Sequence, residues 1–149
     1  MATARLARED ELDEVLALYR MLNPNDPELA PGEVAETWAE MLADPTLDVV
    51  VVEHDGRLVA TCVCSVARNL TRGARPWAVV ENVVTHEDHR GRGFGSQCVE
   101  HAVDRARERD CYKVMLLTGS EEAWKHEFYE GCGFDAADKT GFVRYLDTR

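Results

Sequence analysis

The sequence predicts a mixed α/β (α+β) fold, in which helices cover both faces of a mixed β-sheet in three layers. The chain has 149 residues, which suits a single domain over residues 1–149. Its centre, residues 47–69, has the pattern of a β-hairpin, and residues 77–117 have the pattern of a strand, a helix and a second strand. An antiparallel hairpin followed by a β-α-β unit gives a sheet of mixed direction.

Two helices are expected before the hairpin, after a short apolar start at residues 4–6. Asp10 can cap the first helix, which should end near Asn23, where an Asn-Pro-Asn-Asp-Pro run forms a turn. The second helix begins near Pro31, a residue tolerated in a first turn, and stops at the Asp-Pro pair 44–45. Apolar residues recur at helical spacing in both: Leu12, Val15, Leu16, Tyr19 and Leu22, then Val34, Trp38, Met41 and Leu42.

The later elements follow from runs of β-forming residues and from two further helical stripes. An Asp-Gly pair at 55–56 is a tight hairpin turn, and residues 69–76 form a polar loop. The crossover through the first of these helices should be right-handed and join parallel strands. In order, we expect strands over 47–53, 57–69 and 77–85, a helix with Phe94, Cys98, Val99, Ala102, Val103 and Ala106, a strand over 113–117, a helix over 123–132 and a strand over 142–146.

The charge balance disfavours nucleic acid as a partner. With 28 acidic and 17 basic side chains, the formal net charge is −11, so a general attraction to phosphate backbones is missing. The run of about 18 apolar residues that a membrane-spanning helix needs is absent, and residues 1–10 do not resemble a secretion signal. We therefore expect a cytoplasmic protein with no membrane partner. Only Lys113, Lys125 and Lys139 are lysines, a pattern that suits either a high-salt habitat or a biased genome composition.

The cysteines and histidines indicate neither a disulfide framework nor a metal site. Five cysteines without a Cys-x-x-Cys pair are expected to be small buried side chains in a reducing compartment. His86 and His89 flank a glycine-rich loop without further ligands, which favours surface histidines over a metal centre. His54 and His101 should be exposed, and His126 could line a substrate pocket. The cysteines are Cys62, Cys64, Cys98, Cys111 and Cys132.

The most informative segment is Arg90-Gly91-Arg92-Gly93-Phe94-Gly95, between the end of a strand and the start of a helix. Its three glycines let the backbone approach a ligand, and the helix start adds a partial positive charge. A phosphate-bearing ligand is expected there, although a plain strand-to-helix turn would also explain the glycines. The Gly-Lys-Ser/Thr ending of a Walker loop is absent, and the loop follows a hairpin rather than the first strand of a dinucleotide-binding array.

In this setting the segment resembles the acyl-CoA signature of the GNAT superfamily of N-acetyltransferases, Arg/Gln-x-x-Gly-x-Gly/Ala, with Arg90, Gly93 and Gly95 at its fixed positions. The similarity continues in residues 81–86 and in residues 128–134, which resemble the family's Phe-Tyr-x-x-x-Gly-Phe. It looks closest to the small glucosamine-phosphate N-acetyltransferase branch. The match is dense over residues 77–134, whereas the first 76 residues agree only in the order of elements.

The resemblance implies how acetyl-CoA is held. The strand over 77–85 would splay from the strand over 113–117, and the pantetheine arm would enter the gap like an added strand. A backbone N–H near Val83 or Val84 would polarise the thioester carbonyl, and N–H groups of the glycine loop would hold the pyrophosphate. The implied cofactor-binding residues are Val83, Val84, Thr85, Arg90, Gly91, Arg92, Gly93, Phe94, Gly95 and Ser96.

Two side chains are candidates for the proton transfers of acetyl transfer. Tyr129 matches the position of the family's acid and would protonate the leaving thiolate; the alternative is packing beside Trp124 and Phe128. Glu81 is the candidate base, because a carboxylate within an apolar strand is costly to bury unless it is used or paired. The alternatives are an exposed or ion-paired carboxylate, with a water chain as the base. A bulge in the strand would change the face to which Glu81 points.

The sequence therefore predicts an acetyl-CoA-dependent N-acetyltransferase that acts without a metal, by direct transfer to a primary amine of a small molecule or peptide. Two departures from the family pattern concern the acceptor. Asn82 stands where the branch often has an acid, and residues 120–127 lack an asparagine found in many members. Glu121, Glu122 and Glu127 would favour a cationic acceptor. Alternatives are a non-catalytic acyl-CoA-binding or sensing domain and a nucleotide-phosphate-binding module; the oligomeric state is open, with a homodimer as one alternative.

Overall fold

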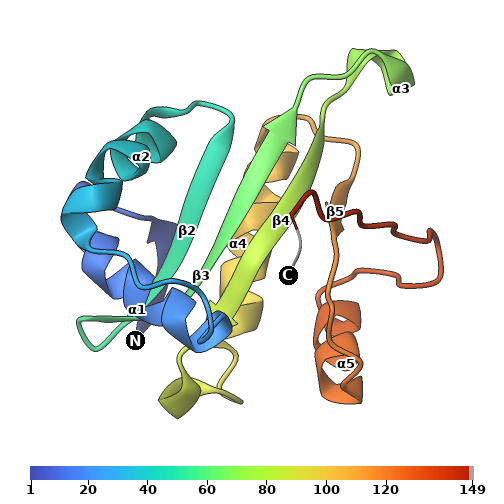
Figure 1. Cartoon of the computed structure of the whole chain (residues 1–149). Coiled ribbons are helices and arrows are strands. Elements are labelled where there is room, and N and C mark those ends of the chain that lie inside the picture. Colours follow the sequence, from blue (N-terminus) through green and yellow to red (C-terminus); the bar gives the residue numbers. More distant parts are fainter. Residues whose placement is uncertain (148–149) are drawn as a thin grey trace. The chain divides into compact units, whose positions relative to one another are not determined.

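The computed structural model describes residues 1–147 and divides the chain into two compact units, residues 1–116 and the residues from 117 onward (Figure 1). The first unit contains a five-stranded sheet in the order β1-β2-β3-β4-β5. Neighbouring strands are antiparallel except β4 and β5, which are parallel. The mixed sheet is therefore confirmed. The strands are β1 (Ala2–Leu6), β2 (Leu47–His54), β3 (Arg57–Ala67), β4 (Trp77–Thr85) and β5 (Val114–Leu116).

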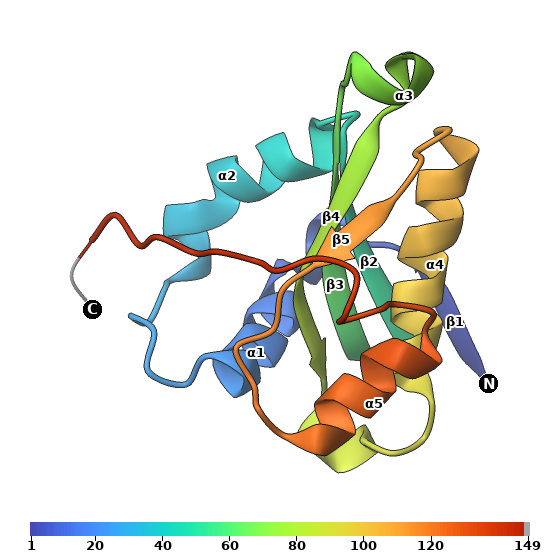
Figure 2. The ribbon, with the colours of Figure 1, turned by 90° about the vertical axis from the view of Figure 1, so that its right-hand side faces the viewer.

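Helices cover both faces of this sheet, which confirms the three layers. Figure 2 views the sheet close to edge-on, with α1 and α2 on one side and α4 on the other. One buried cluster joins α4 to the sheet through Phe94, Cys98 and Val50, and a second joins α1 and α2 to the opposite face through Val15, Trp38 and other residues. The helices of this unit are α1 (Leu12–Leu22), α2 (Pro31–Ala43), α3 (Thr71–Ala74) and α4 (Phe94–Glu108), with 3-10 turns η1 (Glu9–Glu11) and η2 (Glu87–His89).

Buried valine side chains fill both faces of the strand β2. Val49, Val50, Val51 and Val52 are all at most 3% exposed, because β2 lies between two strands and has a helix layer on each face. β-Branched side chains suit such a doubly covered strand. Cys62 and Cys64 are buried on the α4 face, and Cys98 of α4 packs with them, as expected for small core side chains. No helix within residues 1–147 has both the length and the apolar character needed to cross a membrane.

Three expectations need correction. The short apolar start is a full strand, β1, since it pairs with β2 over five residues. The expected loop over 69–76 contains the single turn α3, in which Arg72 and Gly73 have left-handed φ values of +56° and +73°. The last strand, over 142–146, is wrong: these residues are outside regular structure, and Phe142 and Leu146 are at least 90% exposed. A β-forming run becomes a strand only where a neighbouring strand offers hydrogen bonds.

The second unit is built around one helix, α5 (Ala123–Gly131), which agrees with the expected helix over 123–132. The helix ends as Gly133 takes a φ of +91°, and the Phe134 N–H bonds back to the Tyr129 carbonyl oxygen at 3.0 Å. A left-handed glycine just after the last turn is a common way to satisfy the final carbonyls of a helix.

Candidate active site

The glycine-rich loop joins β4 to α4 within the first unit. After η2 and Arg90, the helix begins at Phe94 with Gly93 as its N-cap. Gly91 and Gly93 have φ values of +76° and +84°, a region that costs a residue with a Cβ roughly 1–2 kcal/mol. A Cβ added at either glycine would meet no atom within 4 Å. Glycine is therefore favoured here by the backbone conformation, and the space beside it is open to a ligand.

The N-terminus of α4 is suited to an anion. No side chain caps this end, and the helical bonding begins with the Gln97 N–H donating to the Gly93 carbonyl oxygen at 3.0 Å. Backbone N–H groups in the first turn of a helix point out along its axis, and the helix dipole concentrates partial positive charge there. These N–H groups can bind phosphate oxygens.

Both arginines of the loop stay close to this helix end. The Arg90 Nε donates to the Thr85 carbonyl oxygen at 3.3 Å, which ties the loop to the last residue of β4. The Arg92 guanidinium lies over the Phe94 ring, 5.1 Å from its centroid. The structure thus brings the predicted loop residues and the end of β4 together, and supplies two positive charges in an acidic protein.

Two histidines, His54 and His89, contact Arg92, an arrangement that the sequence did not indicate. The Arg92 guanidinium nitrogens lie 3.2 Å from the His89 Nδ1 and 3.3 Å from the His54 Nε2. The His54 ring packs 4.9 Å from the Phe94 ring and its side chain is only 15% exposed, so the expectation of an exposed His54 is wrong. Partial burial lowers the pKa of His89, and the charges of His86 and Arg92 lower it further. A neutral imidazole can accept a hydrogen bond from Arg92.

Half of β4 has an edge without a strand partner. β5 pairs only with Ala78, Val79 and Val80, so within residues 1–147 no strand pairs with that edge beyond Val80. On the β3 side, a bulge places Asn82 and Val83 together opposite the single residue Cys62, with Asn82 at a φ of +54°. A bulge re-aims the groups on the strand, and the open edge offers backbone N–H and C=O groups to an extended ligand.

Glu81 lies immediately before the bulge. It pairs with Val63, and paired residues of antiparallel strands point to one face, so Glu81 belongs to the face covered by α1 and α2. The side chain is exposed rather than buried. We expected Glu81 to be used or paired because a buried carboxylate is costly, and that argument was wrong because Glu81 is not buried. The alternative of an exposed carboxylate describes its position. Its role as a base stays a prediction.

Sequence reasoning missed Tyr19, which it placed only in an apolar helix stripe. The buried Tyr19 hydroxyl has no partner in hydrogen-bond geometry within the described residues. Burial raises the pKa of Tyr19 to about 12, a shift that the nearby Asn82 side chain partly opposes. The hydroxyl therefore lies next to the bulge of β4. The only signal in the sequence was a polar tip on an otherwise apolar stripe.

The candidate acid, Tyr129, lies on α5 in the second unit and is partly buried. Its ring packs against Phe128, at 5.0 Å between centroids, and Phe134, at 6.4 Å. His126 is exposed, and its Nε2 lies 2.8 Å from the Ser120 carbonyl oxygen, so it holds the turn before the helix. Across residues 1–147 no group of three His, Cys, Asp or Glu side chains is arranged to hold a metal ion.

Comparison with known proteins agrees with this geometry. The sequence pattern of the acetyltransferase (GNAT) family matches residues 15–134. Glucosamine 6-phosphate N-acetyltransferase 1 of Oryza sativa subsp. japonica is 35% identical over 127 residues, which cover 80% of this chain and 72% of the rice protein. A solved structure from Agrobacterium tumefaciens str. C58, provisionally described as an acetyltransferase, is 47% identical with a TM-score of 0.92, over 97% of this chain and 99% of its own.

The fold extends to more distant structures. The aminoglycoside N-acetyltransferase AAC(6')-Iy, solved in complex with CoA, has a TM-score of 0.80 at 17% identity, over 99% of this chain and 96% of its own. At that identity the likeness concerns the fold alone. The family match over residues 15–134 and the rice relative, however, show that this chain belongs to the acetyltransferase (GNAT) family and is an N-acetyltransferase.

Proposed function

We propose that the chain transfers the acetyl group of acetyl-CoA directly to a primary amine of a small molecule or peptide, and that residues 1–149 form one catalytic domain. The observation that carries the proposal is the open edge of β4 next to the uncapped N-terminus of α4. One ligand with an extended amide-bearing arm and a pyrophosphate matches both features. The family pattern, which extends over both units, supports a single domain.

Each part of acetyl-CoA has a complementary group in the first unit. The N–H groups from Gly91 to Ser96, with the charges of Arg90 and Arg92, suit the pyrophosphate. The amides of the pantetheine arm suit the unpaired edge near Val83 and Thr85, where an extended ligand can add to a sheet as a strand does. A backbone N–H at Val83 or Val84, turned by the bulge, would polarise the thioester carbonyl.

The transfer requires two proton movements. The amine nitrogen attacks the thioester carbonyl carbon, the C–S bond breaks, the nitrogen loses a proton and the sulfur gains one. We assign the gain at sulfur to the Tyr129 hydroxyl. Glu81, or a water that it orients, takes the proton from the amine; its exposed position on the α1 and α2 face suits contact with a substrate from solvent.

For the acceptor we infer a small amine. The rice relative is a glucosamine 6-phosphate N-acetyltransferase, which supports an amino sugar. Asn82 stands at the bulge where the glucosamine-phosphate branch often has an acid, which counts against a sugar acceptor. The exposed carboxylates of Glu121, Glu122 and Glu127 instead support a cationic acceptor such as a polyamine. Residues 1–147 contain no disulfide bond, which supports placement in the reducing cytoplasm.

An amine panel tests the proposal. The full chain is incubated with acetyl-CoA and glucosamine 6-phosphate, glucosamine, spermidine or a short peptide, and released thiol is measured with a thiol-reactive dye. A blank without acetyl-CoA corrects for the protein's own cysteines. We expect thiol release that depends on one class of amine, and thermal stabilisation by acetyl-CoA but not by ATP. Thiol release that no amine increases would refute the catalytic proposal and favour a sensing domain.

A further inference from the structure

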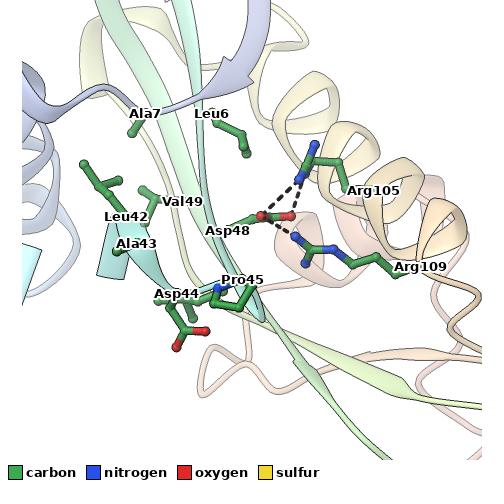
Figure 3. A pocket seen from close by; sticks show the side chains of 11 residues that line it. Leu6, Ala7, Leu42, Ala43, Asp44, Pro45, Asp48, Val49, Arg105 and Arg109 are labelled. Atoms are coloured by element: carbon green, nitrogen blue, oxygen red, sulfur yellow. Dashed lines mark hydrogen bonds and ion pairs between the residues drawn. The ribbon is translucent and has the colours of Figure 1, made fainter. Parts of the chain in front are cut away.

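A charged cavity lies away from the glycine-rich loop. It measures about 230 Å³ and is bounded by the residues after β1, the end of α2, the start of β2 and the last turns of α4 (Figure 3). Asp48, near the start of β2, lines this cavity. His54, at the other end of β2, contacts Arg92 of the glycine-rich loop. Six residues of strand span about 20 Å, so the two places are distinct.

Three charged side chains define the polar wall. Asp48 is only 3% exposed and contacts Arg105 in the last turns of α4 and Arg109, the C-cap residue of that helix. The Arg105 Nε and Nη2 donate to its carboxylate at 2.6 and 3.4 Å, and the Arg109 Nη2 donates at 2.9 Å. Figure 3 shows all three side chains directed toward one another from β2 and α4. This contact raises the pKa of Arg105.

Within residues 1–147, Asp48 is the one carboxylate that forms an ion pair with Arg105 or Arg109, so these three side chains carry one excess positive charge. One guanidinium is enough to balance the charge of the Asp48 carboxylate. Both arginines are mostly buried, since the Arg105 side chain is 28% exposed and the Arg109 side chain is 25% exposed. Each guanidinium has five N–H donors, of which the bonds to Asp48 use two in Arg105 and one in Arg109. The remaining donors can bind a second carboxylate in the paired, fork-like geometry that arginine favours.

Other negative groups nearby reduce this charge without removing it. The Asp44 carboxylate lines the cavity, but it accepts the Thr46 backbone N–H at 2.8 Å and the Thr46 hydroxyl at 2.7 Å. In Figure 3 it is turned away from the guanidinium groups. Glu108 also acts on Arg105, and the C-terminus of α4 adds a partial negative charge that is weaker than a carboxylate.

The rest of the wall is apolar, with Leu6, Leu42 and Pro45 among its side chains. We propose that this cavity binds a small monocarboxylate with a short apolar chain, whose carboxylate bridges Arg105 and Arg109 and whose chain lies against Leu42 and Pro45. The volume fits such a molecule, since it equals about eight water volumes of roughly 30 Å³. A protein of net charge −11 repels anions in general, so saturable binding of one here would be specific.

Butyrate is the probe that tests this site. We titrate the ¹⁵N-labelled full chain with butyrate at constant ionic strength and follow the amide chemical shifts of Asp44 and Arg109. These shifts should saturate, with a Kd of about 1 mM. Inorganic phosphate should not match butyrate at these amides, because it has no apolar chain. Arg109→Gln should weaken butyrate at least about tenfold. Arg107→Gln is the matched control: Arg107 lies in the same turn of α4 but pairs with Asp104 outside the cavity, so butyrate affinity should be unchanged.

A second variant reverses the sign of the effect. Asp48→Asn removes the carboxylate that competes for both arginines, so butyrate should bind more tightly, which a purely structural ion pair would not produce. Should Asp48→Asn fail to fold, the Arg109→Gln comparison alone decides. Absence of saturable shifts, equal affinity of wild type and Arg109→Gln, or phosphate shifts as large as those of butyrate would each overturn the proposal.

Discussion

Gly93→Ala separates the backbone requirement of the glycine loop from its role in binding. Gly93 has φ +84° and ψ 4°, and an added Cβ would meet no atom within 4 Å. The substitution should therefore cost only the left-handed conformation, roughly 1–2 kcal/mol of unfolding free energy. At about 2–4 °C per kcal/mol for a domain of this size, Tm should fall by roughly 2–8 °C. The protein stays folded and can be assayed.

The folded Gly93→Ala variant should also bind CoA more weakly than the wild type, an effect separate from the loss of stability. The new methyl group enters the open space beside the helix N-terminus, where the proposed pyrophosphate lies. Loss of one charge-assisted hydrogen bond costs about 1.5–3 kcal/mol, which corresponds to an increase in Kd of about 10- to 150-fold. Isothermal titration calorimetry of the folded variant with CoA measures it.

Gly73→Ala provides the matched control. Gly73 has a φ of +73°, and an added Cβ there also meets no atom within 4 Å. It belongs to α3, before β4, whereas the glycine loop follows β4, so the two are separated by the length of a nine-residue strand, about 30 Å. Tm should fall by a similar amount, with CoA affinity unchanged. Equal CoA affinity of the wild type and both variants would refute the assignment of the loop.

Four further predictions concern catalysis and charge. Tyr129→Phe keeps the ring contacts and should slow the chemical step by about 10²-fold with little change in CoA affinity; an unchanged kcat with rate-limiting chemistry would make Tyr129 a packing residue. Glu81→Gln should impair kcat/KM at low pH and recover as rising pH deprotonates the amine; the same loss at every pH would mean that Glu81 only positions substrate. Because the pKa of His89 is lowered by folding, its contribution to stability is complete above the unfolded value of about 6.5 and is lost as pH falls from there through the lower folded pKa. His89→Gln should therefore flatten the acid side of the Tm profile, and a profile parallel to the wild type would contradict this. If the charge of −11 is an adaptation to brine, Tm should climb into molar KCl, whereas a plateau above about 0.2 M, where screening acts within roughly 7 Å, favours a genome bias.

Local patterns were enough to predict most of the elements. The bounds of β4 match the expected strand over 77–85, and α2 starts and stops at the prolines that predicted it. The parallel pairing of β4 with β5 follows from a crossover helix. These features depend on propensity, periodicity and turn residues, which neighbouring residues encode by themselves. The glycine loop was found for the same reason, since its φ values are local properties.

What the tertiary structure decided depends on residues that are distant in the chain. Residues 142–146 have the composition of a strand, but no described strand pairs with them, so composition alone misled. The exposure of Glu81, the position of Tyr19 beside Asn82 and the packing of His54 on Phe94 arise where separate elements meet. The contact of Asp48 with Arg105 and Arg109 joins segments 57 and 61 residues apart. The sequence by itself determined most of the elements and the left-handed glycines of the loop, because both are local. Only the packed sheet and helices decided which charges are buried and which meet, because desolvation and Coulomb energy depend on distance in space rather than along the chain.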